Sequence, residues 1–130
     1  MKFNRIIDLD WTFRVLTIGL GVLMLFHGVH KILNGVDFIT PLLEVYSIPY
    51  AEYLAYGVYI GEVIAPLLLI SGYYIRVAGG VIVLNMLVAI FLVHQNEIFT
   101  LTEHGSWSLE IPMLYLVIGL ALLLSKEPHR

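Results

Sequence analysis

The sequence predicts an all-α fold, an integral membrane bundle of four antiparallel helices. Two observations lead to this prediction. Of the 130 residues, 59% are hydrophobic and only 13% are charged, whereas a soluble domain is about half apolar and a quarter charged. The apolar residues also gather into four segments, each close to the roughly 20 residues that cross a bilayer as a helix. One soluble core could not bury this much apolar surface, so we expect the helices to lie in a membrane.

The four expected spans form a single transmembrane domain, residues 1–130, and cover about 13–33, 53–74, 76–94 and 108–125. The second and third spans are joined almost directly, which predicts a tight helical hairpin. The connection 34–52 contains Pro41 and Pro49, so we expect a loop with about one turn of interfacial helix. Asp8 and Asp10 precede the first apolar run, and no small-x-small cleavage site follows it, which argues against a cleavable signal.

Lysine and arginine predict the orientation, because they collect on the cytoplasmic side of membrane proteins. Only Lys31 falls on one side of the predicted bundle. The other side holds six such residues: Lys2, Arg5, Arg14, Arg76, Lys126 and Arg130. We therefore expect both termini in the cytoplasm, in a multi-pass protein of the cytoplasmic (inner) membrane.

Charge and cysteine content narrow the possible functions. A net charge of −3 gives no reason to expect nucleic acid as a partner. The chain has no cysteine, so it has no disulfide and no thiol redox chemistry of its own.

The first span ends on an unusual stretch, FHGVHK, which carries His27, His30 and Lys31. Lys31 lies two residues from the expected helix end, so it is expected to reach water and to suit the negative end of the helix dipole. His30 is expected to be solvated as well. His27 lies about 9 Å inside the span at 1.5 Å per residue, where it needs a partner. It is either bonded to a neighbouring helix or part of a functional site.

The second span offers a partner for His27. Glu62 is its only charged residue and is expected at a similar depth, so the two residues form the candidate catalytic pair. Pro66 lacks the N–H that would bond to the Glu62 carbonyl, which predicts a kink beside the acid. Gly57, Gly61 and Ala65 form a stripe of small residues, which predicts close packing against another helix.

Three further polar residues have simpler expected roles. Asn85, in the middle of the third span, is expected to bond between helices. Glu110 opens the fourth span and suits the positive end of that helix; its depth also allows it to join His27 and Glu62. His94 is half a turn out of phase with Asn85, so we expect it to be solvated.

These residues together resemble the DoxX family of small four-helix membrane proteins. The resemblance rests on Arg14 at the start of the first span, HGVHK at 27–31, GE at 61–62, the turn from Gly72 to Arg76 with Ala78 after it, and Glu110. It covers about residues 13–125. The family name comes from a subunit linked to respiratory quinone chemistry and thiosulfate oxidation. The resemblance therefore implies the fold, the membrane and a possible link to quinone. Many relatives continue with a Gly-rich tail, whereas this chain ends at SKEPHR.

Three classes of function follow, and the sequence leaves open whether the protein is an enzyme. The first is a quinone-linked redox subunit whose ligand-binding residues are His27, His30, Lys31, Glu62 and Glu110. The second is a non-catalytic membrane anchor for a soluble or membrane-bound redox partner. The third is a small proton-coupled transporter in which Glu62 titrates. A homo-oligomer fits all three classes. Quinone is a possible ligand, and no haem or metal is expected, because His27 and His94 differ in phase and depth and His-x-x-His is not a specific metal signal.

Overall fold

The computed structural model describes residues 2–126 and the side chains of residues 11–126. Helices account for most of the described chain, which contains no named strand. Six are α-helices: α1 (Lys2–Asn34), α2 (Ile39–Glu44), α3 (Ala51–Leu54), α4 (Ala65–Ser71), α5 (Ile75–Val93) and α6 (Glu110–Leu124). The all-α prediction is therefore confirmed. The side chains of Lys2, Arg5, Asp8 and Asp10, and residues 127–130 with Arg130, lie outside the described part.

Three helical stretches are long and apolar enough to cross a membrane: Trp11–Asn34, Ala51–Ser71 and Ile75–Val93. They coincide with the first three expected spans. The fourth apolar helix, α6, has 15 residues, fewer than the stretch 108–125 that the sequence predicts. It begins only at Glu110, because residues 108 and 109 form a turn, and it ends where Ser125 becomes extended.

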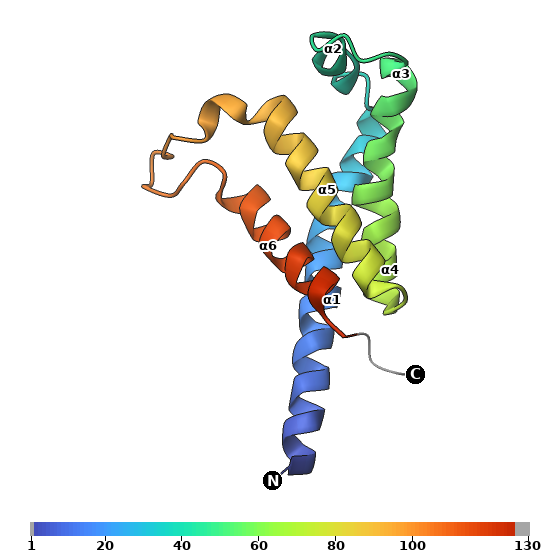
Figure 1. Cartoon of the computed structure of the whole chain (residues 1–130), viewed down its shortest axis with the longest axis vertical. Coiled ribbons are helices and arrows are strands. Elements are labelled where there is room, and N and C mark those ends of the chain that lie inside the picture. Colours follow the sequence, from blue (N-terminus) through green and yellow to red (C-terminus); the bar gives the residue numbers. More distant parts are fainter. Residues whose placement is uncertain (1, 127–130) are drawn as a thin grey trace.

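Helix α1 is longer than the sequence predicts and begins at Lys2 instead of near residue 13. Neither glycine nor proline occurs before Gly19, so nothing in this part of the chain interrupts a helix once it has formed. Figure 1 shows the result: the N-terminal turns of α1 extend well past the rest of the bundle.

The helices pack as two close pairs, α1 with α4 and α5 with α6 (Figure 1). Glycines lie at both contacts. A Cβ atom at Gly21 would lie 2.8 Å from the Pro66 carbonyl oxygen, and one at Gly79 would lie 2.6 Å from the carbonyl oxygen of Gly119. Helices in a membrane rely on such close backbone approach, because lipid supplies no hydrophobic force between them. Fully buried Met24, Leu69 and Ile82 fill the space between the pairs.

The second span is irregular in the region where a kink is expected. After α3 the chain forms a 3₁₀ turn, η1 (Ala55–Gly57), and a π-helical turn, η2 (Ile60–Ile64), before α4 begins. Pro66 has no N–H to donate to the carbonyl four residues earlier, so the regular ladder cannot run through this point. The π turn is the form that the irregularity takes, and Glu62 lies within it. π turns inside helices occur frequently at functional sites.

The expected tight hairpin between the second and third spans is confirmed, since α4 ends at Ser71 and α5 begins at Ile75. Gly72 and Tyr74 both adopt left-handed backbone conformations, with φ of 84° and 51°. Two arginines bind the helix ends at this side of the bundle. Arg14 donates to the carbonyls of Leu69 and Ile70 at distances of 3.3 and 2.9 Å. Arg76 donates to the carbonyl of Leu123. Each cation thus satisfies orphan carbonyls at the negative end of a neighbouring helix.

Candidate functional site

A cavity of about 640 Å³ lies between the helices, and its wall comes from α1, η2, α5 and α6, with α2, α3 and η1 contributing at the end of the bundle. Most of the lining side chains are apolar. Six lining residues carry polar groups: His27, Lys31, Glu62, Asn85, His94 and Tyr115. A mostly apolar cavity with a few polar groups is the usual form of a small-molecule site.

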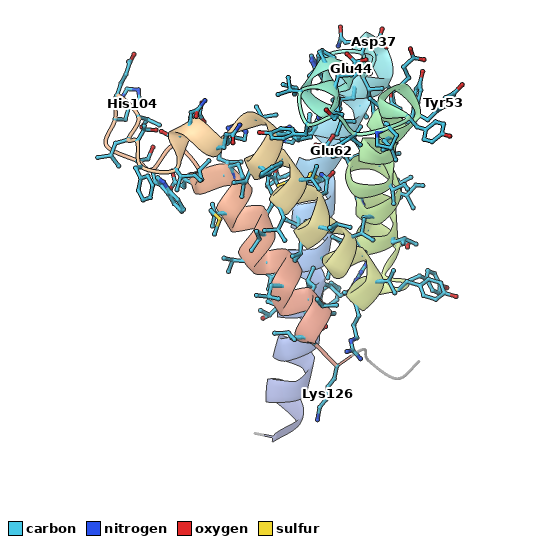
Figure 2. The ribbon with its side chains drawn as sticks, turned by 45° about the horizontal axis from the view of Figure 1, so that its top comes forward. Asp37, Glu44, Tyr53, Glu62, His104 and Lys126 are labelled. Carbon is cyan, nitrogen blue, oxygen red and sulfur yellow. The ribbon has the colours of Figure 1, made fainter. Side chains whose placement is uncertain are left out.

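The charged part of the cavity is an ion pair between Lys31 and Glu62. The Lys31 Nζ atom lies 2.6 Å from Glu62 Oε2, and the two side chains are 15% and 8% exposed. The contact joins two opposite charges directly. Burial strengthens that attraction, because the surroundings have a lower dielectric constant than water. Figure 2 shows Glu62 in the interior, whereas Asp37, Glu44 and Tyr53 lie at the α2 end.

The pair corrects the expectation that Lys31 reaches water. In an α-helix each Cα–Cβ bond tilts toward the N-terminus. At the C-terminal end of α1 this tilt directs the Lys31 stem back into the bundle, to the depth of Glu62. The Tyr59 hydroxyl donates to the Lys31 carbonyl at 2.9 Å and holds this part of α1 against the second span.

Gly28 allows α1 to approach Glu62 closely. A Cβ atom at Gly28 would overlap the Glu62 carbonyl oxygen. This is the carbonyl that Pro66 leaves without its regular helical partner. The missing side chain of Gly28 therefore lets the backbone of α1 lie directly against the π turn, which brings Lys31 within reach of Glu62.

Asn85 adds a neutral polar group to the same cavity. The Asn85 side chain packs against Gly61, where a Cβ atom would lie 2.5 Å from the Asn85 Cγ. Its Nδ2 atom is buried and has no hydrogen-bond partner among the described residues. The contact with Gly61 fits the expected interhelical position, but no interhelical hydrogen bond accompanies it. The amide is thus a buried donor available to a ligand.

His27 lines the cavity but forms no ion pair with Glu62 within the described part of the chain. It is exposed, and its ring packs edge-on against Tyr115 with centroids 6.0 Å apart and planes at 88°. The structure thus exchanges the expected roles of the two α1 residues: Lys31 turns inward to Glu62, and His27 lies at the cavity edge. Tyr115 was not expected in the site; an aromatic residue in an otherwise aliphatic span is the only signal that the sequence offers.

The other two predicted site residues, His30 and Glu110, do not join this cluster. His30 is exposed and its ring nitrogen lies 3.2 Å from the Asn34 amide. Glu110 is exposed at the start of α6 and does not line the cavity. His94 lines the cavity, although we expected it to be solvated. Helix α5 ends at Val93, so the helical repeat no longer sets the direction of the His94 side chain. The His94 Nδ1 atom lies 2.8 Å from Glu97 Oε2. The described residues contain no group of three or more His, Asp or Glu that could hold a metal ion.

The small-residue stripe of the second span is only partly a packing surface. Gly61 lies at a close contact, as predicted, and Ala65 is buried. The prediction for Gly57 is wrong: a Cβ atom there would meet nothing within 4 Å. Gly57 instead lines the cavity, because the irregular turns between residues 55 and 64 alter the helical phase on which the stripe was based.

Chemically, the site pairs an apolar wall with polar groups that carry no net charge when Lys31 and Glu62 are both ionised. It can donate hydrogen bonds from Asn85 and Lys31, and the Glu62 carboxylate can accept them. Such a site suits a neutral amphiphile with a polar head better than a free anion, since the positive charge is already compensated.

Comparison with known proteins identifies one family. The family model described as DoxX matches residues 14–95, which is more than half of the chain and includes Lys31, Glu62 and Asn85. No curated protein and no solved structure matches the chain.

Proposed function

The chain belongs to the DoxX family, and from this premise we propose that it is a quinone-linked subunit of a membrane redox complex. In this proposal the polar part of the cavity binds the head of a membrane quinone. Apolar side chains of α2, α3 and α5 surround the rest of the ligand. The observation that carries the proposal is the buried, unpartnered Asn85 amide beside the Lys31–Glu62 pair in an otherwise apolar cavity.

The donor groups fit this ligand. A quinone head has carbonyl oxygens that accept hydrogen bonds, and Asn85 Nδ2 and Lys31 Nζ are donors. Reduction to the quinol consumes two electrons and two protons. In this proposal the Lys31 ammonium would supply one proton to the head, and the Glu62 carboxylate would relay the second from water. We assign the electrons to a redox partner, which is the role of a subunit rather than that of a complete enzyme.

The topology that we propose has four spans, with α6 as the fourth and both termini in the cytoplasm. Lys126 and Asp37 lie at opposite ends of the molecule (Figure 2), as this topology requires. The excess of lysine and arginine at the Lys126 end supports this orientation and the cytoplasmic (inner) membrane. The cavity then lies toward the outer leaflet.

A second candidate is a small proton-coupled carrier, favoured by the broken second span. Transporters often place a titrating residue where a spanning helix is interrupted, and Glu62 lies in the π turn η2. Proteoliposomes distinguish the two functions. A carrier takes up protons together with a solute, whereas a quinone-linked subunit binds quinone and moves no solute.

The test of the quinone proposal is the lipid content of the purified protein. We expect mass spectrometry of a solvent extract to find quinone close to one mole per mole of protein. Asn85→Leu should lower this amount at least tenfold, because it removes the free donor. His30→Gln is the matched control, since His30 is exposed and absent from the cavity lining, and it should retain quinone. Equal, trace amounts in parent and both variants would refute the proposal.

A further inference from the structure

The connection between α5 and α6 contains a short antiparallel hairpin, residues 100–108, that follows the 3₁₀ turn η3 (Gln95–Glu97). Leu101 pairs with Trp107 in a β-bridge. The hairpin bonds its own backbone: Thr102 N–H donates to the Ser106 carbonyl at 2.7 Å, and Ser108 N–H donates to the Thr100 carbonyl at 3.1 Å. Figure 1 shows this segment, in orange, projecting sideways from the ends of α5 and α6.

The two faces of the hairpin differ in polarity. Successive side chains of an extended strand point to opposite faces. Hydroxyl pairs occupy one face, with Thr100 and Ser108 oxygens 2.7 Å apart and Thr102 and Ser106 oxygens also 2.7 Å apart. Leu101 and Trp107, paired across the bridge, occupy the other face.

Most of the apolar face has no cover within the described protein, although Trp107 itself is only 38% exposed. Leu101 is 70% exposed, and Phe99, just before the hairpin, is 99% exposed. The indole N–H of Trp107 already donates to the Ile98 carbonyl at 2.7 Å. Trp107 can therefore enter an apolar environment without leaving a donor unpaired.

The length of α6 indicates what covers this face. Its 15 residues span roughly 22 Å at 1.5 Å per residue, whereas the hydrocarbon core of a bilayer is about 30 Å thick. Several ångströms of hydrocarbon therefore lie beyond one or both ends of α6. The hairpin adjoins the N-terminal end. It is a two-stranded ribbon with open edges, so its backbone suits the hydrated interface of a membrane, from where apolar side chains can reach the acyl chains.

We propose that residues 98–108 form an amphipathic hairpin that lies in the membrane interface and inserts Phe99, Leu101 and Trp107 into the leaflet at the α2 end. The partner of this surface is the phospholipid bilayer at the level where head groups meet acyl chains, a position that tryptophan favours. The hydroxyl face and the polar tip, with Glu103 and His104, remain in water. Figure 2 shows His104 at the tip of the hairpin. The hairpin thus completes the membrane contact that α6 is too short to make. This inference is independent of the ligand in the cavity.

The test uses neighbouring positions on opposite faces. The chain has no cysteine, so Leu101→Cys and Thr102→Cys each supply a single thiol. In nanodiscs that hold one copy of the purified protein, a charged, membrane-impermeant maleimide should label Thr102→Cys at least tenfold faster than Leu101→Cys. Because each disc holds one copy and, apart from the scaffold protein at its rim, no other protein, neither a second copy nor a soluble partner can account for protection. Equal labelling rates would overturn the proposal.

A second measurement leaves the hairpin sequence intact. Trp11→Phe makes Trp107 the only tryptophan. Lipids brominated high on their acyl chains should quench its fluorescence more than lipids brominated near the chain ends, and aqueous iodide should quench it weakly. Strong quenching by iodide with none by brominated lipid would place the apolar face in water and refute the proposal.

Discussion

Replacing Lys31 by Met tests the ion pair that organises the cavity. The change keeps an apolar stem of similar length but leaves the Glu62 carboxylate, in a residue 6% exposed, without its cation. Breaking a buried pair from one side costs about 3–5 kcal/mol. We expect the lower end, about 3 kcal/mol, because the Lys31 side chain is itself 15% exposed.

This loss is large enough to measure as a melting temperature. The entropy of unfolding is about 2.1 cal/mol/K per residue, or roughly 0.27 kcal/mol/K for 130 residues, so about 3 kcal/mol lowers the melting temperature by roughly 10 °C. Circular dichroism in detergent measures it. His30→Met is the matched control, because His30 lies next in sequence and is exposed; it should melt close to the parent.

The reverse change should cost less. Glu62→Gln leaves the ammonium of Lys31 near the end of α1, from where its flexible stem can turn to the interface, so we expect a loss of no more than about 1 kcal/mol. The double variant Lys31→Met/Glu62→Gln has neither charge and should recover most of the stability that Lys31→Met loses. If Lys31→Met has the same melting temperature as the parent, or if the double variant is less stable than both single variants, the buried pair does not stabilise the folded protein.

Two further predictions concern packing and topology. Gly28→Ala should lower the melting temperature in detergent by several degrees, because its Cβ would overlap the Glu62 carbonyl oxygen. Gly57→Ala is the control and should have the same melting temperature as the parent, since a Cβ there has open space. Equal effects of the two substitutions would contradict the described packing. A single cysteine at Asp37 should react with an impermeant thiol reagent in intact cells, and one at Lys126 should not; the opposite pattern would invert the proposed orientation.

The sequence predicts the spans well, because hydrophobic length is a property of the local chain. It places the first three within a few residues, apart from the start of α1, and it locates the α4–α5 hairpin. The second span shows where local patterns fail. Pro66 predicts an irregular helix, but it does not predict whether a kink or the π turn η2 results. The choice changes the helical phase, which is why Gly57 was wrongly placed at a close contact.

The site shows the same limit. The sequence identifies Glu62 as the unusual buried acid, because a single carboxylate in an apolar span needs a partner. It assigns that partner by depth, as His27, and depth measured along the helix axis ignores the direction of the side chain. Lys31 begins one turn higher but points back into the bundle, so it reaches Glu62 first. Asn85 and His94 line the cavity because of how the helices pack against one another. That packing cannot be predicted from the pattern of any single helix.

The most direct test of the proposed function is photolabelling with an azido-quinone in membranes that contain the protein. We expect the label on residues that line the cavity, within η2 and around Asn85, and we expect excess unmodified quinone to prevent it. Asn85→Leu should lose this labelling, while His30→Gln keeps it. Labelling confined to lipid-exposed residues of α1 and α6, unaffected by excess quinone and equal in parent and Asn85→Leu, would contradict the proposal that the cavity binds quinone.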